Sequence, residues 1–260
     1  MYTNSVNMEL GPGKGSLTGF YPVFANMNHS CVCNTVTVKL PDHALEVRSL
    51  GRIARGEEIT TQYVSPEKTT NIRRKMLYNK WMFWCECARC GDGTECQSYL
   101  GALLCPDRKC LGVSVARDPR DEETEYSCQT CGESVSSEYV ANIYRQAQRD
   151  LKTPDSRYDL IEHLELFLFN YGDVLHPNNY LCISVKQKLG SLYGSCPPYT
   201  IQSLSTPMVE RKLQVCLDVL HTLGKVDPGV NRWRQSILSE INKARIALKI
   251  RRKTNFILKP

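Results

Sequence analysis

The 260-residue sequence contains no run of about 18 consecutive apolar residues, which a membrane-spanning helix needs. Its first residues, MYTNSVNMELGPGKG, also lack the basic segment and apolar run of a secretory signal. Neither charge is in great excess, because 33 Lys+Arg face 27 Asp+Glu, a formal net charge of +6. This composition excludes a disordered polyelectrolyte and is too mildly basic to indicate nucleic-acid binding. We therefore expect a globular protein of the cytosol or nucleus.

Cysteine, in contrast, is abundant: ten of the 13 residues lie between Cys31 and Cys131. In a reducing compartment these are thiols, and thiols at short spacing usually bind metal. The segment CECARC offers Cys85, Cys87 and Cys90 as three zinc ligands from one loop, with the fourth to come from elsewhere. The alternative is a chance group of buried thiols.

A second group of cysteines consists of two pairs separated by 17 residues, Cys105 with Cys110 and Cys128 with Cys131. Two such pairs resemble a small zinc ribbon, although the first pair is more widely spaced than the usual C-x2-C. Cys96 is a substitute ligand for this site. Structural thiols without metal are the alternative.

Three segments rich in β-branched residues predict strands: TVTVKL (35–40), ALEVRSL (44–50) and EEITTQYV (57–64). The first two flank a turn at Pro41-Asp42 and predict a hairpin. The segment from Glu67 to Trp81 favours a helix with Ser65 as its cap and Pro66 in its first turn. Residues 85–132 show little periodicity, and the charged stretch 117–125 predicts an exposed loop.

From residue 136 onward, apolar residues recur at the spacing of one helix face. The three runs are Leu160, Ile161, Leu164, Phe167, Leu168 and Tyr171; Leu181, Val185, Leu189 and Leu192; and Val209, Leu213, Leu217 and Leu220. The third helix is expected to start with Thr206 as cap and Pro207 in the first position. A fourth is expected over 231–249. Successive helices with short loops predict an irregular array resembling tetratricopeptide repeats.

The motif NHSC (28–31), read with GEEITTQYV (56–64) and CECARC (85–90), resembles the SET-domain lysine methyltransferases. The order and spacing are similar to the SMYD group, which combines SET with a MYND zinc finger, and to its arthropod Smyd-A branch in particular. The stretches YGDVLHPNNYL (171–181) and ERKLQVCLDVLHTLGKVDPG (210–229) resemble that group's C-terminal helical domain.

The resemblance implies an α+β fold in four parts. These are the C-terminal part of a SET domain (1–66), a post-SET zinc segment (67–95), a Cys-rich insert (96–135) and an α-helical TPR-like domain (136–260). It also implies that the MYND finger and the first half of the SET domain, with its Gly-containing cofactor loop, are absent. We therefore expect a partial chain with half of the cofactor pocket.

SET enzymes transfer a methyl group from S-adenosylmethionine to a neutral lysine amine. The resemblance implies that Asn28, His29 and Phe83 bind the cofactor, that Trp81 lines the lysine channel and that Tyr63 is catalytic. The alternative for His29 is a core histidine whose hydrogen bonds are all made within the protein. The alternative for Tyr63 is a strand tyrosine that packs at the surface. Trp81 and Phe83 are equally well explained as core aromatics.

The resemblance also completes the first zinc site, because it joins Cys31 to Cys85, Cys87 and Cys90 on one structural Zn²⁺. Cys33 stands where the family commonly has proline, and its thiol could compete as a ligand. The second group of cysteines offers a further Zn²⁺ site.

The predicted function is therefore SMYD-type N-methylation of lysine in a histone or non-histone protein. The alternative is a non-catalytic, zinc-stabilised interaction module whose helical array binds a partner protein. The basic C-terminal stretch 243–260 is explained as a solvated helix face, so nucleic acid is not an expected partner.

Overall fold

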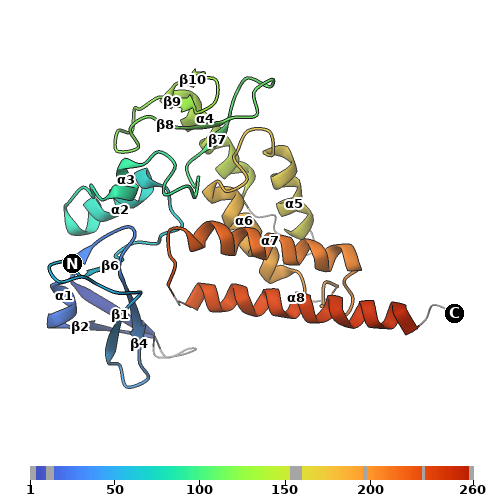
Figure 1. Ribbon diagram of the computed structural model, residues 1–260, viewed down its shortest axis with the longest axis horizontal. Coiled ribbons are helices and arrows are strands. Elements are labelled where there is room, and N and C mark those ends of the chain that lie inside the picture. Colours follow the sequence, from blue (N-terminus) through green and yellow to red (C-terminus); the bar gives the residue numbers. More distant parts are fainter. Residues whose placement is uncertain (1–3, 10–14, 153–159, 196–197, 230–231, 258–260) are drawn as a thin grey trace.

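The computed structural model describes residues 4–9, 15–152, 160–195, 198–229 and 232–257. Short strands gather toward the N-terminal end and long helices toward the C-terminal end, which is the predicted mixed architecture (Figure 1). The strands are β1 (Ser5–Glu9), β2 (Ser16–Phe20), β3 (Asn28–His29), β4 (Thr35–Lys39), β5 (Leu45–Ser49), β6 (Thr60–Thr61), β7 (Leu103–Leu104), β8 (Val113–Ala116), β9 (Tyr126–Cys128) and β10 (Ser134–Val135).

The helices are α1 (Pro22–Ala25), α2 (Thr70–Trp81), α3 (Ala88–Gly91), α4 (Ser137–Asp150), α5 (Leu160–Asn170), α6 (Tyr180–Leu192), α7 (Thr206–Gly224) and α8 (Arg232–Ile257). The fourth predicted helix thus extends beyond its expected end at 249. Among the described helices, none combines the length and apolar character that crossing a membrane requires.

The N-terminal strands form three separate two-stranded sheets. β4 and β5 make the predicted antiparallel hairpin, in register from Thr35 opposite Ser49 to Lys39 opposite Leu45. β3 pairs with β6 in parallel, which places the NHSC motif beside the strand that precedes Tyr63.

The predicted strand over 57–64 is wrong for all but Thr60–Thr61. Side chains replace the missing ladder partners on both sides of this short strand. The backbone N–H of Tyr63 donates to the His29 ring, the N–H of Thr60 donates to the Asn34 Oδ1, and the Asn34 Nδ2 donates to the carbonyl of Glu58. Such local side-chain bonds compete directly with sheet pairing.

Helix α2 begins at Thr70, with Thr69 as N-cap, so the prediction of a start at Ser65-Pro66 is wrong. The carbonyl groups that would begin an earlier helix are occupied by buried arginines. Arg89 donates to the carbonyl oxygen of Pro66 at 2.7 Å, and Arg73 donates to that of Lys68. These carbonyls are therefore bound to buried side chains rather than to helical N–H groups.

Residues 103–135 form an antiparallel sheet in the order β10-β9-β8-β7. Sequence periodicity did not predict it, because strands of two to four residues are too short to show alternation. The charged stretch 117–125 forms the loop between β8 and β9, and most of it is exposed, as expected.

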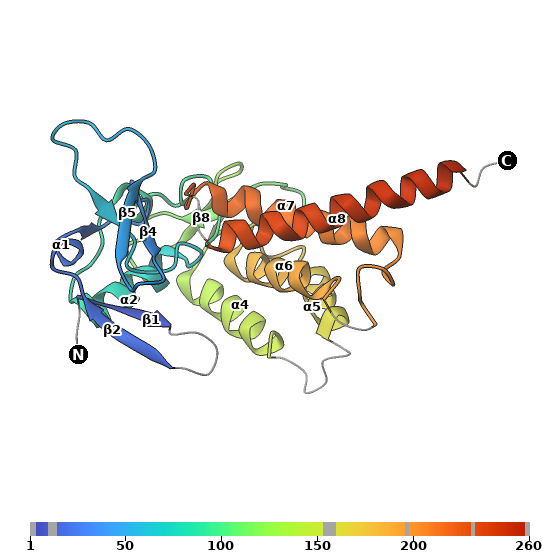
Figure 2. The same cartoon turned by 90° about the horizontal axis from the view of Figure 1, so that it is seen from below.

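The helical half has one continuous core built mainly from α5, α6, α7 and α8. In both views α7 and α8 lie side by side and antiparallel (Figures 1 and 2). Most predicted inward residues of α5 and α6 are buried, including Leu164, Phe167 and Leu189. The others pack against the core while only partly buried: Leu160, Leu168 and Leu192.

Helix α7 differs from its prediction in two ways. Ser205 is its N-cap and Thr206 is its first residue. Its most buried side chains include Lys212 and Val215, whereas Leu213, Leu217 and Leu220 are only partly buried. The reason is that α7 packs against both α6 and α8, which widens its buried face.

Candidate functional site

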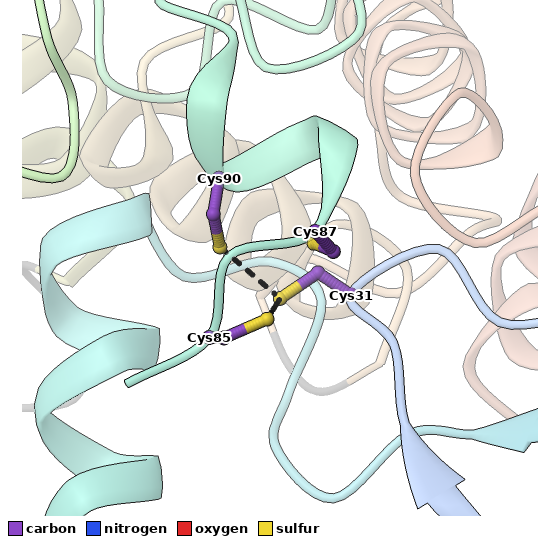
Figure 3. Close-up of side chains that lie close together, drawn as sticks. All are labelled: Cys31, Cys85, Cys87 and Cys90. Atoms are coloured by element: carbon purple, nitrogen blue, oxygen red, sulfur yellow. Dashed lines mark hydrogen bonds between the residues drawn. The ribbon is translucent and has the colours of Figure 1, made fainter. Parts of the chain in front are cut away.

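Four cysteine sulfur atoms meet where β3, the end of α2 and the start of α3 come together; we call Cys31, Cys85, Cys87 and Cys90 the first quartet. Their Sγ atoms all lie within 4.8 Å of one another and point toward one centre (Figure 3). The Sγ of Cys31 is 3.9 Å from that of Cys85 and 3.6 Å from that of Cys90. These distances are too long for a disulfide, whose S–S bond is about 2.05 Å.

The geometry fits a tetrahedral zinc site. For a Zn–S bond of about 2.3 Å, the sulfur atoms of a regular tetrahedron lie about 3.8 Å apart. Hydrogen bonds from the other three thiols, and one from His29, lower the pKa of Cys31 below its ordinary value. The thiolate that results is the form in which cysteine binds metal. All four coordination positions are filled by protein, which is typical of a structural site.

Two buried arginines lie behind the first quartet and share one buried carboxylate. The Nε of Arg73 donates to the Sγ of Cys31 at 3.2 Å, and the same guanidinium forms an ion pair with Glu95. Arg89 donates to Glu95 at 2.9 Å. Burial opposes the charge of Arg73, but Glu95 and the thiols of Cys31 and Cys90 raise its pKa above the ordinary value. A permanent positive charge therefore faces the sulfur atoms.

Glu95 reaches the arginines because the chain folds back tightly just after α3. Glu95, Cys96, Gln97 and Tyr99 all have positive φ angles between 51° and 61°. Such left-handed backbone costs roughly 1–2 kcal/mol per non-glycine residue. The Asp92 carboxylate partly offsets this cost by accepting the N–H groups of Thr94 and Cys96. Sequence reasoning missed Arg73, Arg89 and Glu95, and no local pattern marks them as partners.

His29 lies between the first quartet and a group of aromatic side chains. Its Nδ1 accepts the backbone N–H of Tyr63 at 3.1 Å, so the neutral ring carries its proton on Nε2. That nitrogen lies 3.2 Å from the Sγ of Cys31, to which it donates. Both ring nitrogens are therefore engaged within the fold. Only the ring face and the backbone of His29 therefore remain available to contact a ligand.

Tyr63, Trp81 and Phe83 form one aromatic group with His29. The ring centroids of Tyr63 and Trp81 are 4.8 Å apart, and those of Tyr63 and Phe83 are 6.5 Å apart. His29 lies 5.3 Å from Tyr63 and 6.2 Å from Phe83. The structure thus brings together four of the five residues expected at a methyl-transfer site. All four are partly buried rather than sealed in the core.

Met82 causes the turn that separates Trp81 from Phe83. It caps α2 in the left-handed conformation, with φ 61° and ψ 33°, and its N–H donates to the carbonyl of Tyr78. The helix ends there, and the chain turns toward Cys85. One residue therefore positions both the aromatic side chains and the CECARC loop.

The Tyr63 hydroxyl points back to the strand that carries NHSC and donates to the carbonyl oxygen of Met27. Burial raises the pKa of Tyr63 above its ordinary value, so the phenol stays protonated at neutral pH. Its oxygen keeps the capacity to accept a hydrogen bond.

Asn28, the fifth expected residue, precedes His29 in β3. Its side chain is exposed and donates to Glu58 at 2.6 Å. The accessible carboxamide of Asn28 therefore lies next to His29 in the two-residue strand β3.

The other cysteines of the N-terminal half divide clearly. Cys105, Cys110, Cys128 and Cys131 form a second quartet, with Sγ atoms again within 4.8 Å of one another. Among the described cysteines up to Cys131, Cys33 and Cys96 belong to neither quartet. Cys33 instead donates to the carbonyl of Thr35 at 3.0 Å, so it does not compete for the first site in this structure. Cys96 likewise does not replace any ligand of the second quartet.

Comparison with known proteins places these features in a family. The Drosophila melanogaster "SET domain-containing protein SmydA-8, isoform A" is 36% identical over 224 residues, which are 80% of this chain and 45% of that protein. The chain belongs to the SMYD family. No family model matches it.

Other SMYD-type relatives match shorter stretches. The Xenopus laevis "N-lysine methyltransferase SMYD2-B" is 29% identical over 174 residues, 66% of this chain and 36% of that protein. The Arabidopsis thaliana "Histone-lysine N-methyltransferase ASHR1" is 34% identical over 140 residues, 52% of this chain and 28% of that protein. The chain thus spans less than half the length of each of these relatives.

Proposed function

We propose that this chain acts as a SMYD-type protein-lysine N-methyltransferase that uses S-adenosylmethionine. The observation that carries the proposal is the group of His29, Tyr63, Trp81 and Phe83 beside the first quartet, in a chain whose relatives include named lysine methyltransferases. When bound, the cofactor supplies a methyl group on a sulfonium, which is a good leaving group. The protein residues then have to position a neutral amine in line with it.

The face of Trp81 is suited to a lysine side chain. The ammonium of Lys80 already lies 4.2 Å from the centroid of the Trp81 ring, as in a cation–π contact. A substrate lysine has an ordinary pKa of about 10.4 and must lose its proton to react. The Tyr63 and Trp81 rings already touch, with centroids 4.8 Å apart, so a lysine would lie beside this pair and not between the rings. Burial there would strip water from the ammonium, which lowers its pKa and favours the neutral amine.

Tyr63 would orient that amine. Its hydroxyl is fixed by donation to Met27, which leaves the oxygen as an acceptor for an N–H of the lysine. A pre-positioned dipole of this kind acts where positive charge moves during transfer. Because burial keeps the phenol protonated, we assign it a positioning and electrostatic role and not that of a base.

The residues present also fit the cofactor. Phe83 offers a partly exposed ring for an adenine, and Asn28 offers an exposed carboxamide for polar groups. His29 would contribute its ring face or backbone, because both ring nitrogens are engaged. In this proposal Asn28, His29 and Phe83 bind the cofactor. Trp81 binds the substrate lysine, and Tyr63 acts in catalysis.

Zn²⁺ at the first quartet would act mechanically. Cys31 follows the strand that carries Asn28 and His29, and the other three ligands follow directly after Trp81 and Phe83. One ion would therefore hold both walls of the site at a fixed separation. Because no coordination position is left open, the ion would take no part in the chemistry.

The test is methyl transfer from radiolabelled S-adenosylmethionine to core histones, with the full, zinc-loaded chain. Tyr63→Phe should lower the transfer rate about 100-fold or more, as the loss of one positioned hydroxyl does elsewhere. Tyr78→Phe is the matched control, because Tyr78 lies on α2 and stacks on the exposed Trp84. Equal rates for wild type and Tyr63→Phe would contradict the proposed role. A folded chain that neither binds the cofactor nor transfers methyl would favour the non-catalytic interaction module.

A further inference from the structure

The sheet of strands β7–β10 contains the second quartet, which no step of methyl transfer requires. Cys105 directly follows β7, Cys110 precedes β8, Cys128 ends β9, and Cys131 lies in the turn before β10. The Sγ atoms of Cys105 and Cys131 are 3.5 Å apart, and those of Cys110 and Cys128 are 3.8 Å apart. These distances match the edge of about 3.8 Å of a tetrahedral zinc–thiolate site and exclude disulfides.

The backbone around these cysteines is shaped to bring the sulfur atoms together. Gly112 passes so close to the quartet that an added Cβ would lie 2.5 Å from the Sγ of Cys128 and 2.6 Å from the Oγ1 of Thr130. Gly132 follows Cys131 with a φ of +79°, a conformation that favours glycine. The N–H of Thr130 points to the Sγ of Cys128 at 3.4 Å. Each pair of cysteines thus sits in a tight turn that a glycine completes.

This small sheet has almost no apolar core of its own. In residues 103–135, all of which the structure describes, the buried hydrophobic residues are Leu103, Cys105, Ala116 and Cys128. Leu103, with the partly buried Tyr126 and Val135, packs into the core of the helical half rather than into a core of the sheet itself. A unit of about 30 residues with so little buried apolar surface usually needs a disulfide or a metal to hold its fold. Two of the three buried hydrophobic residues of the sheet beyond β7 are thus members of the second quartet, Cys105 and Cys128.

We propose that the second quartet binds one structural Zn²⁺, independently of the first quartet, and that this ion holds the β7–β10 sheet as a zinc ribbon. Four thiolates select zinc over harder cations such as Mg²⁺ or Ca²⁺. The ribbon braces α2 from outside, because Arg74 donates to the carbonyl of Arg120 and Lys75 pairs with Glu122 at 2.7 Å. The second ion therefore supports the helix that ends in Trp81, without touching the site.

The experiment is elemental analysis of the full chain, purified without chelators, combined with two glycine variants that keep every cysteine. Wild type should contain two Zn²⁺ per chain. Gly112→Ala should lower the affinity of one of them at least 10-fold, because its methyl group would collide with Cys128. Gly91→Ala is the matched control beside Cys90, since an added Cβ there meets nothing within 4 Å. It should keep both ions.

Native alkylation of the wild-type chain gives a second readout that needs no variant. Cys131 is exposed, so a free thiol there should react quickly with N-ethylmaleimide. We expect it to resist the reagent until a chelator removes zinc. One Zn²⁺ per chain with fast labelling of Cys131 would overturn the proposal, and so would iron in place of the second zinc. Neither readout depends on methyl transfer, so the two proposals can fail separately.

Discussion

Replacing Arg73 with methionine should weaken zinc binding at the first quartet while leaving the second unchanged. The Arg73 side chain is fully buried and donates to Cys31 at 3.2 Å and to Cys90 at 3.6 Å. A Zn²⁺ with four thiolates carries a net charge of −2, and Arg73 is the guanidinium that contacts its sulfur atoms. Methionine keeps much of the volume but removes the charge and the hydrogen bonds.

The magnitude follows from two estimates. Opposite charges about 4 Å apart attract by about 4 kcal/mol at an effective dielectric constant near 20. Part of this is already offset by the cost of burying the guanidinium. Outer-shell partners of metal ligands typically change affinity 10- to 100-fold, or about 1.4–2.8 kcal/mol. We expect Arg73→Met to fall in that range.

The assay is competition for Zn²⁺ between the chain and a chromophoric chelator. Lys75→Met is the matched control, because it removes an exposed positive charge from the same helix. An unchanged affinity in a folded Arg73→Met chain would refute the argument that the buried guanidinium stabilises the thiolates. An equal loss in Lys75→Met would instead point to net charge or to the contact between Lys75 and Glu122.

Three further predictions concern stability, measured by denaturant unfolding of the zinc-loaded chain. Leu189→Ala, in the core of the helical half, should lower the free energy of unfolding by about 2–5 kcal/mol. Leu238→Ala, at an exposed position, should lower it much less, and equal losses would contradict the assigned core. Met82→Gly should raise the free energy of unfolding by up to about 1 kcal/mol, because glycine adopts left-handed backbone without strain; a clear loss would contradict this. Burial, with two nearby lysines, lowers the pKa of His176 to about 4 from 6.5. The resulting stability is complete above about pH 6.5 and is lost as the pH falls toward 4; His176→Asn should flatten this dependence, and an unchanged slope would exclude His176 as its source.

Local patterns predicted where several elements lie in the chain. The alternation in 35–40 and 44–50 gave the β4–β5 hairpin, and the helical spacing of Leu181, Val185 and Leu189 gave the buried face of α6. The burial pattern follows the apolar pattern only in part, because Thr35 is the buried residue of β4 and α6 buries Lys186 as well as most of its predicted apolar residues. The division of the chain into four parts stays a prediction.

The pattern of apolar residues did not predict which charged side chains are buried. Lys212 is fully buried in α7, where its ammonium donates to the carbonyl of Tyr193 at 2.7 Å and to Glu240 at 2.6 Å. A lysine normally marks an exposed face, so sequence reasoning predicted too narrow a buried face for α7. Glu95 likewise pairs with Arg73 over 22 residues and depends on a left-handed segment that no periodicity reveals.

The sequence predicted which residues form the candidate site, but it did not predict the contacts between them. Family resemblance joined Cys31 to the CECARC cysteines, and the structure assembles the same four. The bonds from His29 to Tyr63 and Cys31 depend on the parallel pairing of two-residue strands, which are too short for a sequence signal. The catalytic and binding roles of these residues stay predictions.

We propose that Asn28, His29 and Phe83 form a cofactor-binding surface. The most direct test is calorimetric titration of S-adenosylmethionine into the full, zinc-loaded chain, beside Asn28→Ala and the exposed control Asn142→Ala on α4. We predict saturable binding to wild type and to the control, weakened at least 10-fold in Asn28→Ala. Equal binding to all three, or no binding to a folded wild-type chain, would contradict the claim.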